Sequence, residues 1–214
     1  MTSVPWKPFI SPTDLEIAQD GLKISFRTLP KTDWWRTGKV HSTSGAYVAV
    51  EHDTLLKDVK SFKLEASIEV NGGHQQHINR IRVLIHILYS QHSDQAGLFL
   101  YISDTLWIKT GLEVVDGQAR VSCVVTDSYA DWSLYPFENQ TAHRFSIQIE
   151  AQESEPLPLI KISYNGHILR ELPAFGMAQG TGQGTGKFRA GVMGCSPLSD
   201  GCEVSFEEIS VEGS

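Results

Sequence analysis

Polar and apolar residues alternate with a period of two along most of this chain, and no window offers three clean turns of helix. The alternation is clearest in segments 22–27, 61–70 and 143–150. Successive strand residues point to opposite faces of a sheet, so each such segment can bury one face against a core. A stretch at residues 13–18 is a candidate for one short helix. The pattern therefore predicts an all-β chain.

Turn-forming pairs separate the segments that we expect to be strands. Asp116-Gly117 and Asn165-Gly166 fit tight hairpin turns, because these residue types tolerate positive φ. Asn71-Gly72-Gly73 and Asp200-Gly201 mark further turns. About ten to thirteen short strands with this spacing predict a β-sandwich of two antiparallel sheets. The remaining candidate strands are residues 80–89, 96–103, 106–114, 119–126, 157–164, 188–195 and 202–211.

Length and charge narrow the class of protein further. The chain has 214 residues, with 25 acidic and 18 basic side chains and a formal charge of −7. A β-sandwich of this length is ordinarily one domain, so we expect a single domain over residues 1–214 with its core at about 20–211. A nucleic-acid partner requires a clustered Lys/Arg footprint, which the sequence lacks. The sequence leaves the oligomeric state open.

The sequence indicates a cytoplasmic protein. Residues 1–12 contain three prolines and no continuous apolar stretch, unlike a signal peptide. The most apolar segment, 81–89, is too short to span a bilayer, so we expect no membrane association. Cys123, Cys195 and Cys202 form no C-x-x-C pair. Free thiols in a reducing compartment are expected, with a Cys195–Cys202 bridge as the alternative.

The segment 106–114 carries an unusual second face. One of its faces is almost entirely apolar and predicts core, whereas the other consists of Trp107, Lys109, Gly111 and Glu113. A glycine inside a strand weakens a sheet, so it is found mainly at a bulge or where another group must approach the backbone closely. Lys109 and Glu113 would lie about 13 Å apart with Gly111 between them. We therefore expect room for a sugar-sized ligand over this glycine.

Neighbouring segments extend this face. A hairpin through Asp104-Thr105 would bring Gln95 and Tyr101 beside the Trp107 face, and the segment that contains Arg80, Arg82, Leu84 and His86 is a further candidate. Sugars stack their C–H faces on aromatic rings while their hydroxyls meet charged or amide groups. The aromatic, charged and amide side chains of this face would therefore suit a small-molecule or oligosaccharide ligand. The alternative is a cross-strand network that only stabilises the sheet.

Two other segments supply candidates for the mouth of this cleft. Asp131 and Trp132 follow the strand 119–126 in what we interpret as a polar loop; alternatively, Trp132 caps the edge of the core. Trp34 and Trp35 must point to opposite faces if their segment is extended, so at most one lines the cleft together with Asp33. Arg36 shares the face of Trp34, and an arginine often stacks on an aromatic ring. Arg36 is therefore a ligand-binding candidate.

We expect no metal and no cofactor. His74 and His77 lie in a Gly-rich turn without a third ligand at useful spacing, and His86 fits a sheet histidine. The glycines between residues 180 and 186 match neither dinucleotide-binding nor P-loop spacing, so they predict a flexible loop. Cys123 alternates with apolar residues and is expected in the core.

Several motifs together resemble a known family. The motifs are D-Q-A-G-L at 94–98, W-I-K-T-G-L-E at 107–113 and D-G at 116–117, with weaker matches at 33–36, 124–126, 131–133 and 191–197. They resemble the family known as domain of unknown function 1349, over about residues 20–211, and are similar to its fungal regulation-of-enolase-like members. The resemblance implies a cytoplasmic, concanavalin A-like lectin/glucanase jelly roll. The Gly-rich stretch 178–187 and the turn 72–77 depart from the family pattern.

Glucanase chemistry is the sharpest test of an enzymatic role. It requires two carboxyl groups roughly 5–9.5 Å apart. The E-x-D-x-E signature of the glucanase branch is absent, because Gly111 and Val115 occupy the positions two before and two after Glu113. A second acid would have to come from Asp131 or Asp33.

Three functions remain open. The first is a non-catalytic module that binds a carbohydrate or sugar derivative and acts in sugar metabolism or its regulation. The second is a hydrolase or lyase acting on a sugar or sugar acid, with Glu113 as acid/base and Lys109 or Arg36 holding an anionic group. The third follows from the resemblance alone: a regulator that binds a metabolic enzyme.

Overall fold

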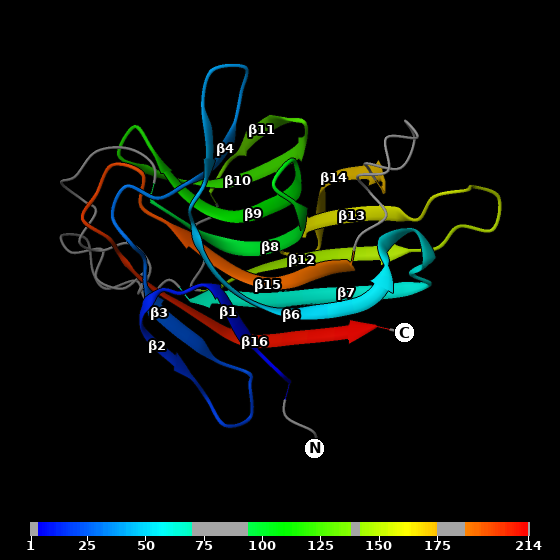
Figure 1. Cartoon of the computed structure of the whole chain (residues 1–214), viewed down its shortest axis with the longest axis horizontal. Coiled ribbons are helices and arrows are strands. Elements are labelled where there is room, and N and C mark those ends of the chain that lie inside the picture. The colour runs from blue at the N-terminus through cyan, green and yellow to red at the C-terminus, as the bar shows by residue number, and fades with distance from the viewer. Residues whose placement is uncertain (1–3, 70–93, 138–141, 175–186, 214) are drawn as a thin grey trace.

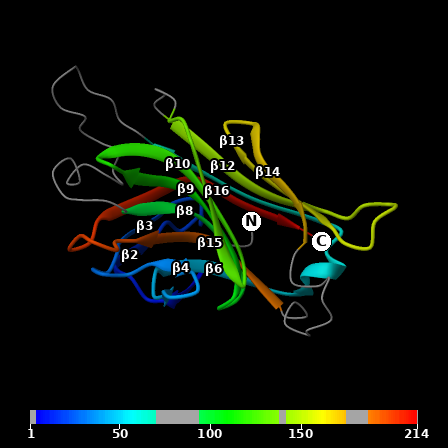
Figure 2. The same cartoon turned by 90° about the horizontal axis from the view of Figure 1, so that it is seen from above.

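The protein consists of two large sheets packed face to face. The computed structural model describes residues 4–69, 94–137, 142–174 and 187–213. These residues form two seven-stranded sheets with antiparallel neighbours, and a separate two-stranded hairpin (Figures 1 and 2). The prediction of an all-β jelly-roll sandwich of two antiparallel sheets is confirmed.

The two sheets draw their strands from distant parts of the chain. In spatial order, the first sheet contains β1 (Lys7–Ile10), β6 (Ala46–Leu55), β15 (Lys187–Cys195), β8 (Gln95–Ser103), β9 (Leu106–Val115), β10 (Gln118–Asp127) and β11 (Tyr129–Tyr135). The second contains β14 (His167–Pro173), β13 (Leu159–Tyr164), β12 (Ala142–Glu150), β7 (Ser61–Glu69), β16 (Glu203–Gly213), β3 (Ile24–Arg27) and β2 (Thr13–Ile17). The hairpin pairs β4 (Trp34–Arg36) with β5 (His41–Thr43), and a 3₁₀ turn spans Leu56–Asp58.

Two predicted hairpin turns are confirmed by their backbone angles. Asp116 and Gly117 have φ of 52° and 72°, and Asn165 and Gly166 have φ of 48° and 81°. Positive φ at both central residues is the geometry that matches the twist of the flanking strands. The first turn sets the register of β9 against β10, and therefore fixes which side chains neighbour Glu113.

Three local predictions are wrong. Residues 13–17 of the expected helix 13–18 form strand β2 instead, because so short a helix does not nucleate alone whereas β3 supplies backbone partners. Asp131 and Trp132 lie in strand β11 and not in a loop. The described part of the chain has sixteen strands, more than the ten to thirteen predicted, and the unpredicted ones include β6 and β14.

Several predictions fall outside the described residues: the strand 80–89 with Arg80, Arg82, Leu84 and His86, the turn with His74 and His77, and the glycines at 180–186. In the part of the chain that is described, no helix is long and apolar enough to cross a membrane.

The main core lies between the sheets. Leu106, Ile108, Leu112 and Val114, the apolar face of β9, belong to it as predicted. Cys123 is also in this core, and burial raises the pKa of its thiol to about 12. All three cysteines are free and buried, as expected for reduced thiols.

Candidate functional site

The outer face of the first sheet is covered and not open. Trp107, which we expected on a ligand-accessible surface, is fully buried in a second apolar cluster that is separate from the main core. The β4–β5 hairpin lies against this face (Figure 1) and inserts Trp34 among the rings of Phe99, Tyr101 and Trp107. The centroids of Trp34 and Trp107 are 5.9 Å apart. The prediction of an exposed Trp107 face is therefore wrong, because the chain folds back over it.

Lys109 anchors the hairpin to the sheet. Only 3% of this residue is exposed, and its ammonium donates to Asp33 Oδ1 at 3.1 Å, to the backbone oxygen of Trp34 at 2.5 Å and to Gln95 Oε1 at 2.7 Å. Three acceptors satisfy all three N–H donors of a lysine. Lys109 Nζ also lies 6.0 Å from the ring centroid of Trp35. The lysine is thus a fixed internal cation.

Gln95 links this cation to a buried carboxyl group. Its Nε2 donates to Glu113 Oε1 at 3.3 Å and lies 3.5 Å from Asp33 Oδ1. Gln95 and Glu113 are direct cross-strand partners in the β8–β9 pair. The predicted proximity of Gln95, Lys109 and Glu113 on one face is confirmed.

Glu113 is held from two sides. Besides the Gln95 contact, its Oε2 accepts from Trp132 Nε1 at 3.1 Å. Burial raises the pKa of this carboxyl, and the positive charge of Lys109 and hydrogen bonds from Ser122 and Trp132 partly oppose that rise. The carboxylate is therefore a costly charge that the surrounding donors only partly stabilise.

Gly111 serves the packing of strands and not the approach of a ligand. A Cβ at this position would lie 2.0 Å from the backbone oxygen of Ala96 and 2.4 Å from Cα of Gly97, its cross-strand partner. The hollow over Gly111 has a volume of about 10 Å³, which is room for about one water molecule. The expected sugar-sized space over Gly111 is therefore absent from this conformation.

The rim of the covered face presents two tryptophans. Trp132, on β11, is 41% exposed, and its N–H also contacts Ser122 Oγ at 3.1 Å. Its ring meets the half-buried ring of Trp35 edge-on, with centroids 6.0 Å apart. Arg36 lies at the same rim, where its Nε donates to the backbone oxygen of Ser128 at 2.7 Å. Trp132, Trp35 and the Glu113 carboxyl beneath them are called the Trp132 mouth below.

Two predicted residues lie apart from this mouth. Asp131 forms an ion pair with Arg170 at 2.6 Å, on the opposite face of β11 from Trp132. It is therefore not brought together with Glu113, as a pair of catalytic acids would require. Tyr101 lies beside Trp34, and its hydroxyl donates to Asp104 at 2.9 Å.

Two residues of the site were missed or undervalued by the sequence reasoning. Ser122 was not a candidate, although counting back from the Asp116-Gly117 turn places it opposite Gly111. Asp33 was considered as a residue lining the cleft and as a second acid, whereas it serves as an acceptor for Lys109. Among the described residues, no three His, Cys, Asp or Glu side chains converge as a metal site would need.

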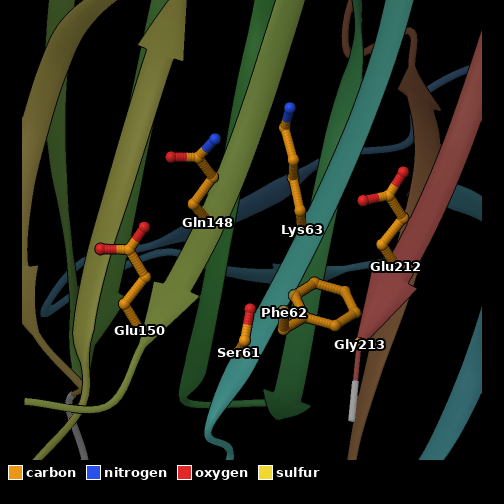
Figure 3. Close-up of a pocket in the computed structure, with 7 residues that line it drawn as sticks. All are labelled: Ser61, Phe62, Lys63, Gln148, Glu150, Glu212 and Gly213. Carbon is orange, nitrogen blue, oxygen red and sulfur yellow. The ribbon is translucent and has the colours of Figure 1, made fainter.

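A larger hollow lies on the outer face of the second sheet. It has a volume of about 370 Å³ and crosses β12, β7 and β16. Figure 3 shows Gln148 and Lys63 extending over it from neighbouring strands, with Glu212 on the far side. The residues that line it are Ser61, Phe62, Lys63, Gln148, Glu150, Glu212 and Gly213, and they include no tryptophan or tyrosine.

Known proteins with related sequences and folds place the chain in a family. The chain is 26% identical over 197 residues to "Regulation of enolase protein 1" of Saccharomyces cerevisiae, covering 91% of this chain and 84% of that protein. A crystal structure of a functionally unknown protein from the same yeast matches with a TM-score of 0.69 and 22% identity, covering 100% and 99% of the two chains.

A more distant structural match is to a longer protein. The GH43 protein BlXynB of Bacillus licheniformis matches with a TM-score of 0.61 and 11% identity, and the match covers 100% of this chain but only 38% of that one. At this identity the likeness shows the fold alone. The model of the family "Protein of unknown function (DUF1349)" matches residues 9–214. This chain, with its hairpin-covered jelly roll, therefore belongs to the DUF1349 family.

Proposed function

We propose that this chain is a cytoplasmic protein that binds a carbohydrate or sugar derivative at the Trp132 mouth. The observation that carries the proposal is the fixed, exposed ring of Trp132. Its N–H is held by Glu113 and Ser122, while 41% of the residue remains exposed. A ring that is already immobilised loses little freedom when a ligand stacks on it.

The surroundings of this ring suit a polyhydroxylated ligand. Trp35 meets it edge-on, which makes an angled aromatic corner. The Asp33 side chain is 23% exposed, and the Arg36 guanidinium lies at the rim. A sugar has an apolar C–H face that stacks on a ring, and hydroxyls that bind to such charged groups. The buried Lys109, Gln95 and Glu113 then act as the scaffold that fixes the corner.

Isothermal titration calorimetry with neutral sugars, uronic acids, sugar phosphates and short oligosaccharides tests this proposal. For any ligand of this panel that binds, we expect Trp132→Ala to weaken the binding by at least about tenfold. Tyr129→Ala is the matched control, because Tyr129 is a 62% exposed aromatic on the other face of the same strand. Equal losses in both variants, or a loss in Gln148→Ala instead, would place the ligand elsewhere.

A catalytic role of Glu113 is less well supported by the geometry. Both of its carboxyl oxygens already accept hydrogen bonds from protein donors, Gln95 and Trp132. Asp33 is linked to it through Gln95 Nε2, but Lys109 engages the Asp33 carboxylate. A general acid must reach the substrate atom that it protonates. If the wild-type protein turned over any sugar of the panel and Glu113→Gln did not, Glu113 would be catalytic and the protein would be more than a binding module.

A second candidate function is the regulation of a metabolic enzyme by direct contact. The observation that favours it is the similarity to "Regulation of enolase protein 1" along most of both chains. Sedimentation of the purified chain with purified enolase, together with enolase assays, tests it. A complex that changes the rate of enolase would support this candidate, whereas independent sedimentation and unchanged rates would remove it.

A further inference from the structure

Among the residues that the structure describes, β11 is the outermost strand of the first sheet, and it forms a regular and exposed edge. Its seven residues pair with β10 residue by residue, without any shift in register. Four of the seven are exposed, among them Tyr129, Trp132 and Leu134. An edge strand carries unpaired N–H and C=O groups that can pair with another chain, so proteins usually protect such edges with proline, charges or bulges.

The other three edges of the two sheets carry such protection. Strand β1 contains Pro8, which cannot donate to a ladder, and its register shifts between Pro8 and Ile10. Strand β2 contains Asp14 and Glu16, and its register also shifts. Strand β14 ends in Pro173, and its register against β13 shifts between Ile162 and Ser163.

Strand β11 is less protected than the other three edges. It contains no proline, lysine or bulge, and its one charged residue, Asp131, already pairs with Arg170 of the second sheet at 2.6 Å. That pairing neutralises the charge that would otherwise repel a second strand. The edge therefore has no unpaired charge and no irregularity in its register. Edge strands that stay unpaired usually have at least one of the two.

The sequence of β11 is also complementary to itself. Reading Tyr129–Tyr135 against its own reverse pairs tyrosine with tyrosine, alanine with leucine and aspartate with serine, and places Trp132 opposite itself. These are aromatic, apolar and hydrogen-bonding cross-strand pairs, and no like charges meet. The same operation on β2 opposes Asp14 to Glu16, and on β14 it opposes Arg170 to itself.

We propose that two copies of this chain associate through antiparallel pairing of β11 with β11 about a two-fold axis at Trp132. Such an interface is isologous, because each residue meets its counterpart under the same rotation. The two first sheets then form one continuous sheet. Opposite residues in an antiparallel pair project to the same face, so the Trp132 mouths of the two copies adjoin at the axis. Pairing does not require that a sugar binds.

Analytical ultracentrifugation across micromolar to near-millimolar concentrations tests the association. We expect a reversible dimer, and we expect Leu134→Lys to raise its dissociation constant by at least about tenfold, because the symmetry introduces the lysine twice into the pairing edge. The matched control is Ile168→Lys, which changes a 58% exposed residue on the protected edge β14. Circular dichroism checks that both variants are folded. A wild-type chain that stays monomeric, or equal effects of the two lysines, would overturn the proposal.

Cysteine cross-linking tests the register independently of dimer strength. Cα atoms of opposite residues lie about 4.5–5.5 Å apart in an antiparallel pair, within reach of a disulfide. Trp132→Cys should therefore form a disulfide between two copies on mild oxidation, whereas Ala130→Cys should not, because Leu134 faces it. The native cysteines are buried and do not interfere. Cross-linking through Ala130→Cys alone would contradict the axis at Trp132.

Discussion

The outer faces of the two sheets use the same kinds of residue in opposite ways. On the first sheet, Lys109, Gln95 and Glu113 lie beneath a hairpin. They form a connected set of hydrogen bonds that also includes Asp33. The hollow that remains there measures about 10 Å³. On the second sheet, Lys63, Gln148 and Glu150 lie around an open hollow of about 370 Å³.

The covering hairpin, and not the residue types, makes the difference. A buried ion loses its hydration, and only well-placed partners restore the lost free energy. Lys109 has three such partners, which is why it can stay buried. The ion pairs Lys63–Glu65 and Lys161–Glu150 on the second sheet keep much of their contact with solvent, so each contributes little to stability. An identical substitution should therefore have very different costs on the two faces.

The largest contrast is expected between Lys109→Met and Lys63→Met. Loss of the Lys109 ammonium removes the ion-pair partner of Asp33 and the lysine hydrogen bonds to Gln95 Oε1 and the Trp34 backbone oxygen, so the free energy of unfolding should fall by about 3 kcal/mol. Lys63→Met should change it by less than about 0.5 kcal/mol. Urea unfolding of both variants measures the difference, and similar costs would show that the hairpin does not exclude water.

A smaller contrast concerns glycine. The Cβ added by Gly111→Ala would collide with the backbone of β8, and we expect a loss of about 1–3 kcal/mol from the forced strand separation. Gly38 belongs to the hairpin, between β4 and β5, and a Cβ there meets nothing within 4 Å. Gly38→Ala should be neutral within about 0.5 kcal/mol. Thermal unfolding of the pair measures this, and a tolerated Gly111→Ala would mean that β8 and β9 can move apart.

The smallest effect is a dependence on pH. Burial raises the folded-state pKa of Glu113 above its ordinary value of 4.5, so in the window above 4.5 the folded state binds more protons than the unfolded state. Stability contributed by the protonated carboxyl is therefore lost as pH rises through this window, with a slope of at most about 1.4 kcal/mol per pH unit. Glu113→Gln should lack this loss. Denaturation midpoints of both proteins between pH 4 and 8 would reveal it, and parallel curves would contradict the burial of the charge.

Short-range patterns in the sequence predicted the sheet part of the site. Alternation placed Lys109 and Glu113 on one face, and the expected hairpin through Asp104-Thr105 placed Gln95 beside them, as the structure confirms. These relations depend only on strand period and hairpin register, which are local properties.

The cover of the site could not be predicted in the same way. Asp33 and Lys109 are separated by 76 positions, and no local pattern states that the hairpin folds back across β9. Strand β11 was mistaken for a loop because Asp131 and Ser133 are polar. Both side chains contact Arg170 of the second sheet, a partner that only the tertiary structure provides.

The placement of the tryptophans has an optical consequence. Four of the five tryptophans of the chain lie on or over the covered face, in two edge-on pairs: Trp34 with Trp107, and Trp35 with Trp132. Indoles this close couple their electronic transitions, so near-ultraviolet circular dichroism and intrinsic fluorescence are dominated by this one region. Because each pair joins a hairpin ring to a sheet ring, the spectrum reports directly on whether the hairpin is seated.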